Sequence, residues 1–161
     1  MTLTFLQNLG PATVDLLVLG GLFLLFFAYA MYFGKDRIIS LILAFYPAQL
    51  LYKIFPFLDK LLVLKGGLWL VVNRIFIFLL FLIPINIIIA RYVFSDSGYG
   101  SQKIFRVAGF SLVGVILVLI FNYSVINFGP IYNFSESIGS LFSPDKIFYW
   151  DLASLGILFF L

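Results

Sequence analysis

Four long runs of apolar residues constrain this chain more than any other feature. The runs cover approximately residues 13–33, 38–58, 68–92 and 104–128. A membrane-spanning helix needs about 20 predominantly apolar residues, and each run reaches that length. Because a bilayer has no water to bond the backbone, apolar runs of this length cross it as helices. The sequence therefore predicts an all-α integral membrane protein, with one helical membrane domain over residues 1–161.

The composition excludes the common classes of soluble protein. Of the 161 residues, 63% are hydrophobic and only 11% are charged. A soluble domain averages about 45–50% apolar and about 25% charged residues, so this chain cannot cover a globule with a wetted surface. The net charge of the chain is +3. A small basic excess of this kind is typical of a membrane protein, because its cytoplasmic loops are enriched in Lys and Arg. We therefore expect the lipid bilayer as a partner, and no nucleic acid.

Chemistry that depends on cysteine or histidine is also excluded. The sequence contains neither residue, which removes disulfides, thiolate nucleophiles, histidine bases and the usual ligands of zinc and haem. The seven Asp and Glu residues are scattered and form no pair at helical spacing. We therefore expect no metal, no cofactor and no enzymatic activity.

The first run has the features of a retained membrane span. No Lys or Arg precedes it, which is unlike a cleavable signal peptide. Pro11 and Thr13 are residue types that begin helices. Gly34 is expected to end the helix, and residues 35–37 are expected to form a tight polar turn.

The second run allows two topologies. Its core, residues 38–52, is too short to cross a bilayer, and it reaches a full span only if Lys53 extends to the interface. Pro47 and Pro56 favour a kinked span. A re-entrant hairpin is the alternative.

The remaining segments are less apolar. Residues 57–67 predict a short interfacial helix, and residues 129–146 predict a loop with one amphipathic turn. The final apolar stretch, 147–161, is interrupted by Asp151 and predicts an interfacial or half-inserted helix, with a fifth span as the alternative. Lys and Arg are shared equally between the two sides of the four-span arrangement. The basic residues that follow the first span then favour both termini outside.

Four polar residues of the predicted spans are candidate functional positions. Asp15 is either an ion-linked carboxylate or, as we favour, a carboxylate in the first turn that faces headgroup water. Asn73 and Arg74 are expected near the interface, with Asp15 and Asp59 as acids that Arg74 could meet inside the bundle. Asn86, close to Pro84, is expected to bond across helices rather than to line a solute path.

Small residues predict close approach of helices. Gly20 and Gly21 lie in the first span, and Ala108, Ser111 and Gly114 share one face of the fourth. Such faces mediate helix association in lipid, within one chain or between chains. A homodimer or a complex with other membrane proteins is therefore expected.

The layout resembles the CvpA family of small bacterial inner-membrane proteins, named after colicin V production. The resemblance covers roughly residues 12–125. The segments that carry it are Val14-Asp15-Leu16, Gly34-Lys35-Asp36-Arg37, Ile38-Ile39-Ser40-Leu41, Ser95-Asp96-Ser97-Gly98, the basic residues Lys103 and Arg106, and Ala108 to Gly114. The turn after the first span and the tail 129–161 depart from the family pattern.

The resemblance implies a multi-pass protein of the bacterial inner membrane that is linked to toxin export or envelope maintenance. It implies no catalytic residues. The alternative function is a small transporter, channel or solute-binding membrane subunit, with Asp15, Arg74 and Asn86 near its path. A lipid-acting enzyme is the weakest of the three hypotheses, because the usual catalytic groups are missing.

Overall fold

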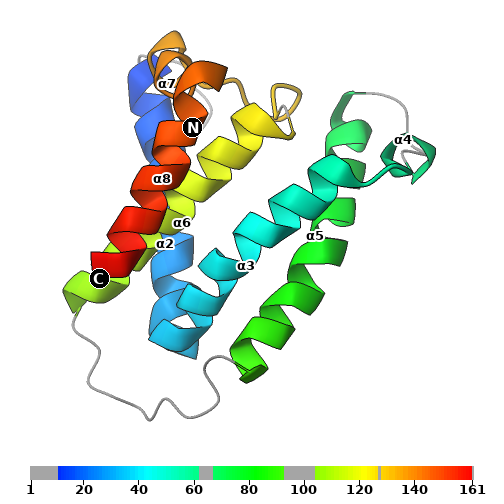
Figure 1. Ribbon diagram of the computed structural model, residues 1–161. Coiled ribbons are helices and arrows are strands. Elements are labelled where there is room, and N and C mark those ends of the chain that lie inside the picture. The colour runs from blue at the N-terminus through cyan, green and yellow to red at the C-terminus, as the bar shows by residue number, and fades with distance from the viewer. Residues whose placement is uncertain (1–10, 62–66, 93–103, 127, 161) are drawn as a thin grey trace.

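The computed structural model describes residues 11–61, 67–92, 104–126 and 128–160, apart from the side chains of Pro11 and Asp59. This part of the chain is helical and contains no strand (Figure 1). The helices are α2 (Pro11–Phe33), α3 (Lys35–Ile54), α4 (Leu58–Leu61), α5 (Gly67–Tyr92), α6 (Ile104–Ser124), α7 (Glu136–Leu141) and α8 (Pro144–Phe160). Four of them, α2, α3, α5 and α6, are long and apolar enough to cross a membrane. The predicted all-α membrane class is confirmed.

The connection between α2 and α3 is shorter than predicted. Gly34 alone separates the two helices, at a φ of 92° that residues with a Cβ atom rarely adopt. Its N–H donates to the carbonyl of Ala30 at 2.9 Å. Residues 35–37 are not a turn, as predicted, but the first turn of α3. Within this turn, Asp36 is favourable near the positive end of the helix dipole.

The second predicted span is a single continuous helix, so the re-entrant alternative is wrong. α3 has 20 residues and accommodates Pro47 without ending. It stops at Ile54, before Pro56, whereas the sequence predicted a span to residue 58. The helix nevertheless reaches 20 residues, because it begins at Lys35, three residues before the expected span.

The other boundaries differ little from expectation. α5 matches the predicted 68–92 within a residue, and α2 begins at Pro11, two residues before the predicted start. α6 ends at Ser124, before the predicted 128, because the chain turns back there. α4 is a single turn within the predicted interfacial segment. α7 provides the predicted turn in the following loop.

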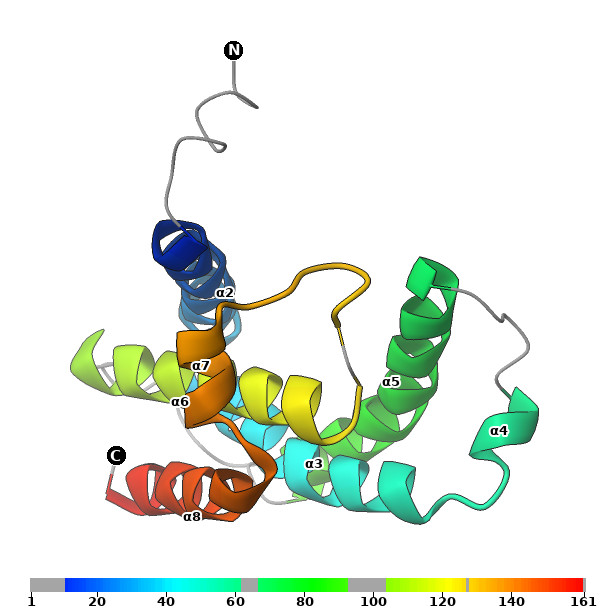
Figure 2. The same ribbon diagram turned by 90° about the horizontal axis from the view of Figure 1, so that it is seen from above.

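The long helices alternate in direction along the chain, and α3 lies at the centre, in contact with α2, α5 and α6 (Figures 1 and 2). Aromatic rings join these helices in the core. The Phe78 and Phe121 ring centroids are 3.9 Å apart, and Phe45 packs edge-on against both, at 5.1 and 5.7 Å. Such ring pairs add about 0.5–1.5 kcal/mol each beyond the burial of their area.

The C-terminal helix α8 lies lengthwise beside α6 and runs in the opposite direction (Figures 1 and 2). The hydroxyl groups of Tyr46 in α3 and Ser154 in α8 are 2.5 Å apart, and Ser154 is fully buried. This position favours an α8 that is inserted alongside the spans over an α8 that lies at the membrane surface, across the end of the bundle. With 17 residues, α8 is about 26 Å long, slightly less than a hydrocarbon core of about 30 Å.

Large apolar side chains cover the outside of the bundle. Leu16 and Leu24 of α2 are 71% and 64% exposed, and Phe76 of α5 is 67% exposed. A soluble protein rarely exposes apolar surface so continuously. In a bilayer the same surface contacts lipid tails, as the four apolar helices require.

Candidate functional site

The chain after α6 folds back against the start of α2, where Asp15 holds it with both carboxylate oxygens. The Tyr132 hydroxyl donates to Oδ1 at 2.5 Å, and the Ser135 backbone N–H donates to Oδ2 at 3.0 Å. Asp15 is only 3% exposed, so these bonds replace those that water would make. The prediction that Asp15 faces headgroup water is wrong, because residues 128–135 cover it.

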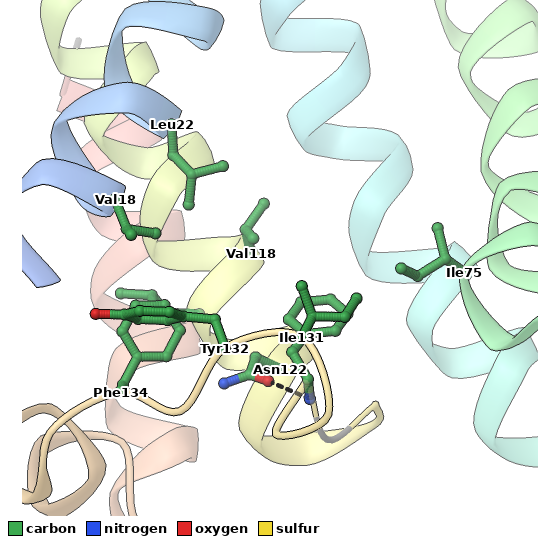
Figure 3. Close-up of a pocket in the computed structure, with 10 residues that line it drawn as sticks. Val18, Leu22, Ile75, Val118, Asn122, Ile131, Tyr132 and Phe134 are labelled. Atoms are coloured by element: carbon green, nitrogen blue, oxygen red, sulfur yellow. Dashed lines mark hydrogen bonds between the residues drawn. The ribbon is translucent and has the colours of Figure 1, made fainter. Parts of the chain in front are cut away.

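A second anchor fixes the other end of this segment. The Asn122 side-chain oxygen accepts a hydrogen bond from the Phe128 backbone N–H at 2.8 Å (Figure 3). Asn122 is buried near the end of α6, so its amide replaces the helical bond that the departing chain no longer makes. The two anchors fix residues 128–135 to α6 at one end and to α2 at the other. This segment is called the cap below.

The cap covers an apolar cavity of about 330 Å³ between α2, α5 and α6. Figure 3 shows Val18 and Leu22 of α2, Val118 of α6 and Ile75 of α5 around it. An engineered cavity of about 150 Å³ with a comparable lining stays dry and binds benzene. By its chemistry, the cavity suits an apolar group better than a hydrated solute.

The Tyr132 hydroxyl makes the stability of the cap depend on pH. Burial, together with the bond to Asp15 and the charge of this carboxylate, raises the pKa of Tyr132 to about 12, from an ordinary value of 10.0. The pKa is higher in the folded state, so the stability contributed by the neutral hydroxyl is complete below pH 10. It is lost as the pH rises toward 12.

We therefore expect a pH-dependent difference between the native protein and Tyr132→Phe. The unfolding free energies of the two proteins in detergent should differ by a constant amount up to about pH 10. The advantage of the native protein should then shrink between pH 10 and about 12. Chemical unfolding of both proteins at a series of pH values measures this difference in free energy. A difference that stays constant to pH 12 would contradict the bond to Asp15.

Asn86 joins α5 to the start of α3. The Ser40 hydroxyl lies 2.9 Å from the Asn86 side-chain oxygen and 2.9 Å from the Arg37 carbonyl. A hydroxyl has one proton, and the two ends of an asparagine amide are interchangeable in shape. If the nitrogen and oxygen of the Asn86 amide exchange places, both contacts are satisfied. The amide nitrogen then donates to the Ser40 oxygen, and the Ser40 hydroxyl donates its one proton to the Arg37 carbonyl. This geometry favours the packing role that we expected for Asn86.

A double-mutant cycle tests this bond. We expect Ser40→Ala and Asn86→Ala to destabilise the protein by less together than the sum of their separate effects. Interhelical hydrogen bonds in membranes couple by about 0.6 kcal/mol on average, and by at most about 1.7 kcal/mol. Unfolding of the four proteins in detergent measures the coupling. Strictly additive effects would show that the two side chains act independently.

Asn73 and Arg74 lie in the second turn of α5, which begins at Gly67, as the predicted span 68–92 had placed them. The Asn73 amide donates to the Leu61 carbonyl of α4 at 3.1 Å. Neither acid that we expected for Arg74 is shown to meet it: Asp15 is bonded to the cap, and the Asp59 side chain lies outside the described residues. The structure therefore places Asp15, Arg74 and Asn86 in three separate environments.

The small residues of the two spans have different surroundings. A Cβ atom added to Gly114 would lie 2.9 Å from the Phe26 ring of α2, so this glycine permits close packing. Ser111 is fully buried and donates to the carbonyl of Val107 in its own helix. Ala108 is half-buried. Gly20 and Gly21 have no described atom within 4 Å of an added Cβ.

Sequence reasoning missed the residues that complete the site. Tyr132 and Ser135 meet Asp15 from 117 and 120 residues away, and no local pattern marks them. Asn122 carried a weak signal, since an amide inside an apolar helix needs a partner. Among the described residues, no group of three or more acids could hold a metal ion.

Comparison of the chain with protein-family models, with curated proteins and with solved structures finds no match.

Proposed function

We propose that this chain is a non-enzymatic, multi-pass protein of the bacterial inner membrane, similar to the CvpA family. Its role is that of an accessory or scaffold protein in toxin export or envelope homeostasis. The four apolar helices support the membrane location. The resemblance of residues 12–125 supports the family and the cellular role.

The observation that carries the proposal is that three polar side chains within the helices are bonded to other parts of the protein. Asp15, Asn86 and Asn122 each form a bond that joins a helix to another helix or to the cap. Bonds of this kind hold a bundle in one arrangement, which is what a docking platform requires. A solute path instead needs polar groups that are free to face water.

The alternative function, a small transporter or channel, is supported mainly by Arg74. A half-buried cation inside a span is a functional position by default. On this hypothesis a solute would have to pass the side chains of Arg74 and Tyr52. We regard the scaffold as the better hypothesis, because Asp15 and Asn86 are occupied by partners within the protein.

Two parallel experiments separate these functions. Crosslinking in the native membrane followed by purification in mild detergent should recover a specific membrane partner, which is absent when a tagged, unrelated four-span protein serves as the control. Liposomes that contain the protein should pass protons and K⁺, reported by a pH-sensitive dye, no faster than empty liposomes. Recovery of no specific partner together with clear flux would overturn the proposal in favour of a transporter.

A further inference from the structure

Where α3 meets α5, three buried hydrogen-bond donors have no partner among the residues that the structure describes. They are the Gln49 side-chain nitrogen, the Tyr52 hydroxyl and the Arg74 Nε. Gln49 and Tyr52 are 6% and 4% exposed, and Arg74 is half-buried. A buried donor without a partner costs about 1–3 kcal/mol, and more if it is charged. The residues that the structure describes therefore supply no acceptor for these three groups.

Ring contacts bring the three side chains to one interface. Phe45 and Tyr52 of α3 both pack on Phe78 of α5, with centroids 5.1 and 6.2 Å apart. Gln49 lies between Phe45 and Tyr52 on the same face of α3, and Arg74 lies one turn before Phe78 on α5. Arg74 and Tyr52 also interact electrostatically. The positive charge of Arg74 therefore acts on the Tyr52 hydroxyl.

The interface lies near one end of the bundle. Tyr52 is two residues from the end of α3, and the neighbour of Arg74, Asn73, bonds to α4 outside the spans. Helical side chains lean toward the N-terminus of their helix, so Arg74 in α5 leans toward this same end. An arginine at this depth can extend its guanidinium to the level of the headgroups.

The chemistry of the cluster selects an anion with several oxygens. Arg74 has no ion pair within the part of the chain that the structure describes. Guanidinium groups bind phosphate through paired, charge-assisted hydrogen bonds, and neutral donors add to them. Lys60, exposed near this end, adds to the local positive potential. A phosphate group would supply the charge and the acceptors that the cluster lacks.

We propose that Arg74, Tyr52 and Gln49 form a binding site for a phosphate group, which an anionic phospholipid headgroup presents at this face of the membrane. Arg74 is the only one of the three that is partly exposed, so the ligand would meet its guanidinium first. The bound phosphate then connects α3, α5 and the surrounding lipid. This site is independent of the scaffold role and of the cap.

Native mass spectrometry of the detergent-purified protein, titrated with phosphatidylglycerol, tests the site. We expect a saturable bound lipid in the native protein. Affinity should fall about tenfold in Arg74→Gln, because one charge-assisted bond is worth about that factor. Tyr52→Phe keeps the ring packing and removes only the hydroxyl, and it should also weaken binding. Arg91→Gln, at the exposed opposite end of α5, is the matched control and should change affinity less than twofold.

A parallel titration with inorganic phosphate separates the two sources of the group. Phosphatidylglycerol binding that both site variants weaken, with no binding of inorganic phosphate, assigns the site to a headgroup. Inorganic phosphate binding with the same sensitivity assigns it to a free phosphate. The proposal is overturned if Arg74→Gln and Tyr52→Phe, with unchanged helical circular dichroism, bind both ligands as the native protein does. It is equally overturned if Arg91→Gln loses as much affinity as Arg74→Gln.

Discussion

Replacing Gly114 with leucine is expected to destabilise the bundle strongly, by about 1–3 kcal/mol. Even the first added carbon would lie 2.9 Å from the Phe26 ring, and the larger side chain would push α6 away from α2. Phe26 is itself only 9% exposed, so its ring cannot simply turn aside. Equilibrium unfolding in detergent, monitored by circular dichroism, measures the loss.

Gly21→Leu is the matched control for this substitution. It introduces the same side chain into an apolar span, but no described atom lies within 4 Å of the added Cβ. We expect its unfolding free energy to stay within about 0.5 kcal/mol of the native value. Phe26→Ala should rescue part of the Gly114→Leu defect, since residues in contact couple. Equal losses at the two glycines would contradict the observed packing of α2 on α6.

Replacing Asp15 with alanine is expected to release the cap. The change leaves the Tyr132 hydroxyl and the Ser135 N–H without their acceptor, at a loss of about 2–4 kcal/mol for bonds to a charged group. Chymotrypsin cleaves after aromatic residues, and the cap contains Tyr132 and Phe134. Its rate of cleavage within residues 128–135 should therefore rise well above that of the native protein.

A second acidic residue provides the comparison. Asp145 lies in the first turn of α8 and is exposed, so Asp145→Ala removes a carboxylate that holds no other segment. We expect this variant to be cleaved in the cap at the native rate. Asp15→Asn retains an acceptor for Tyr132 and should fall between the two. If Asp15→Ala leaves the cleavage rate unchanged, the carboxylate does not anchor the cap.

The spans could be predicted from the sequence because the bilayer imposes their length and composition. Apolar runs identify α2 and α5 to within one or two residues, since lipid contact and helix length are local properties. The error at α3 came from its charged first turn. Residues 35–37 were assigned to a turn on account of their charge, yet Asp36 is compatible with a helix start.

The contacts of the polar and small residues could not be predicted in the same way. Gly20, Gly21 and Gly114 gave the same sequence signal, but only Gly114 faces a ring of another helix. Asp15 was judged from its own helix, whereas its surroundings are set by Tyr132 and Ser135, more than a hundred residues away. Such pairs depend on how the helices are assembled, which no local pattern encodes.

The central claim is that four helices cross the membrane in alternating directions, and single cysteines test it most directly. The natural sequence has no cysteine, so one replacement each at Asp36, Lys60, Ser97 and Ser137 reports without background. A membrane-impermeant thiol reagent is added to intact and to opened cells. The account predicts that positions 36 and 97 label from one side, and positions 60 and 137 from the other. Labelling of positions 36 and 60 from the same side would contradict it.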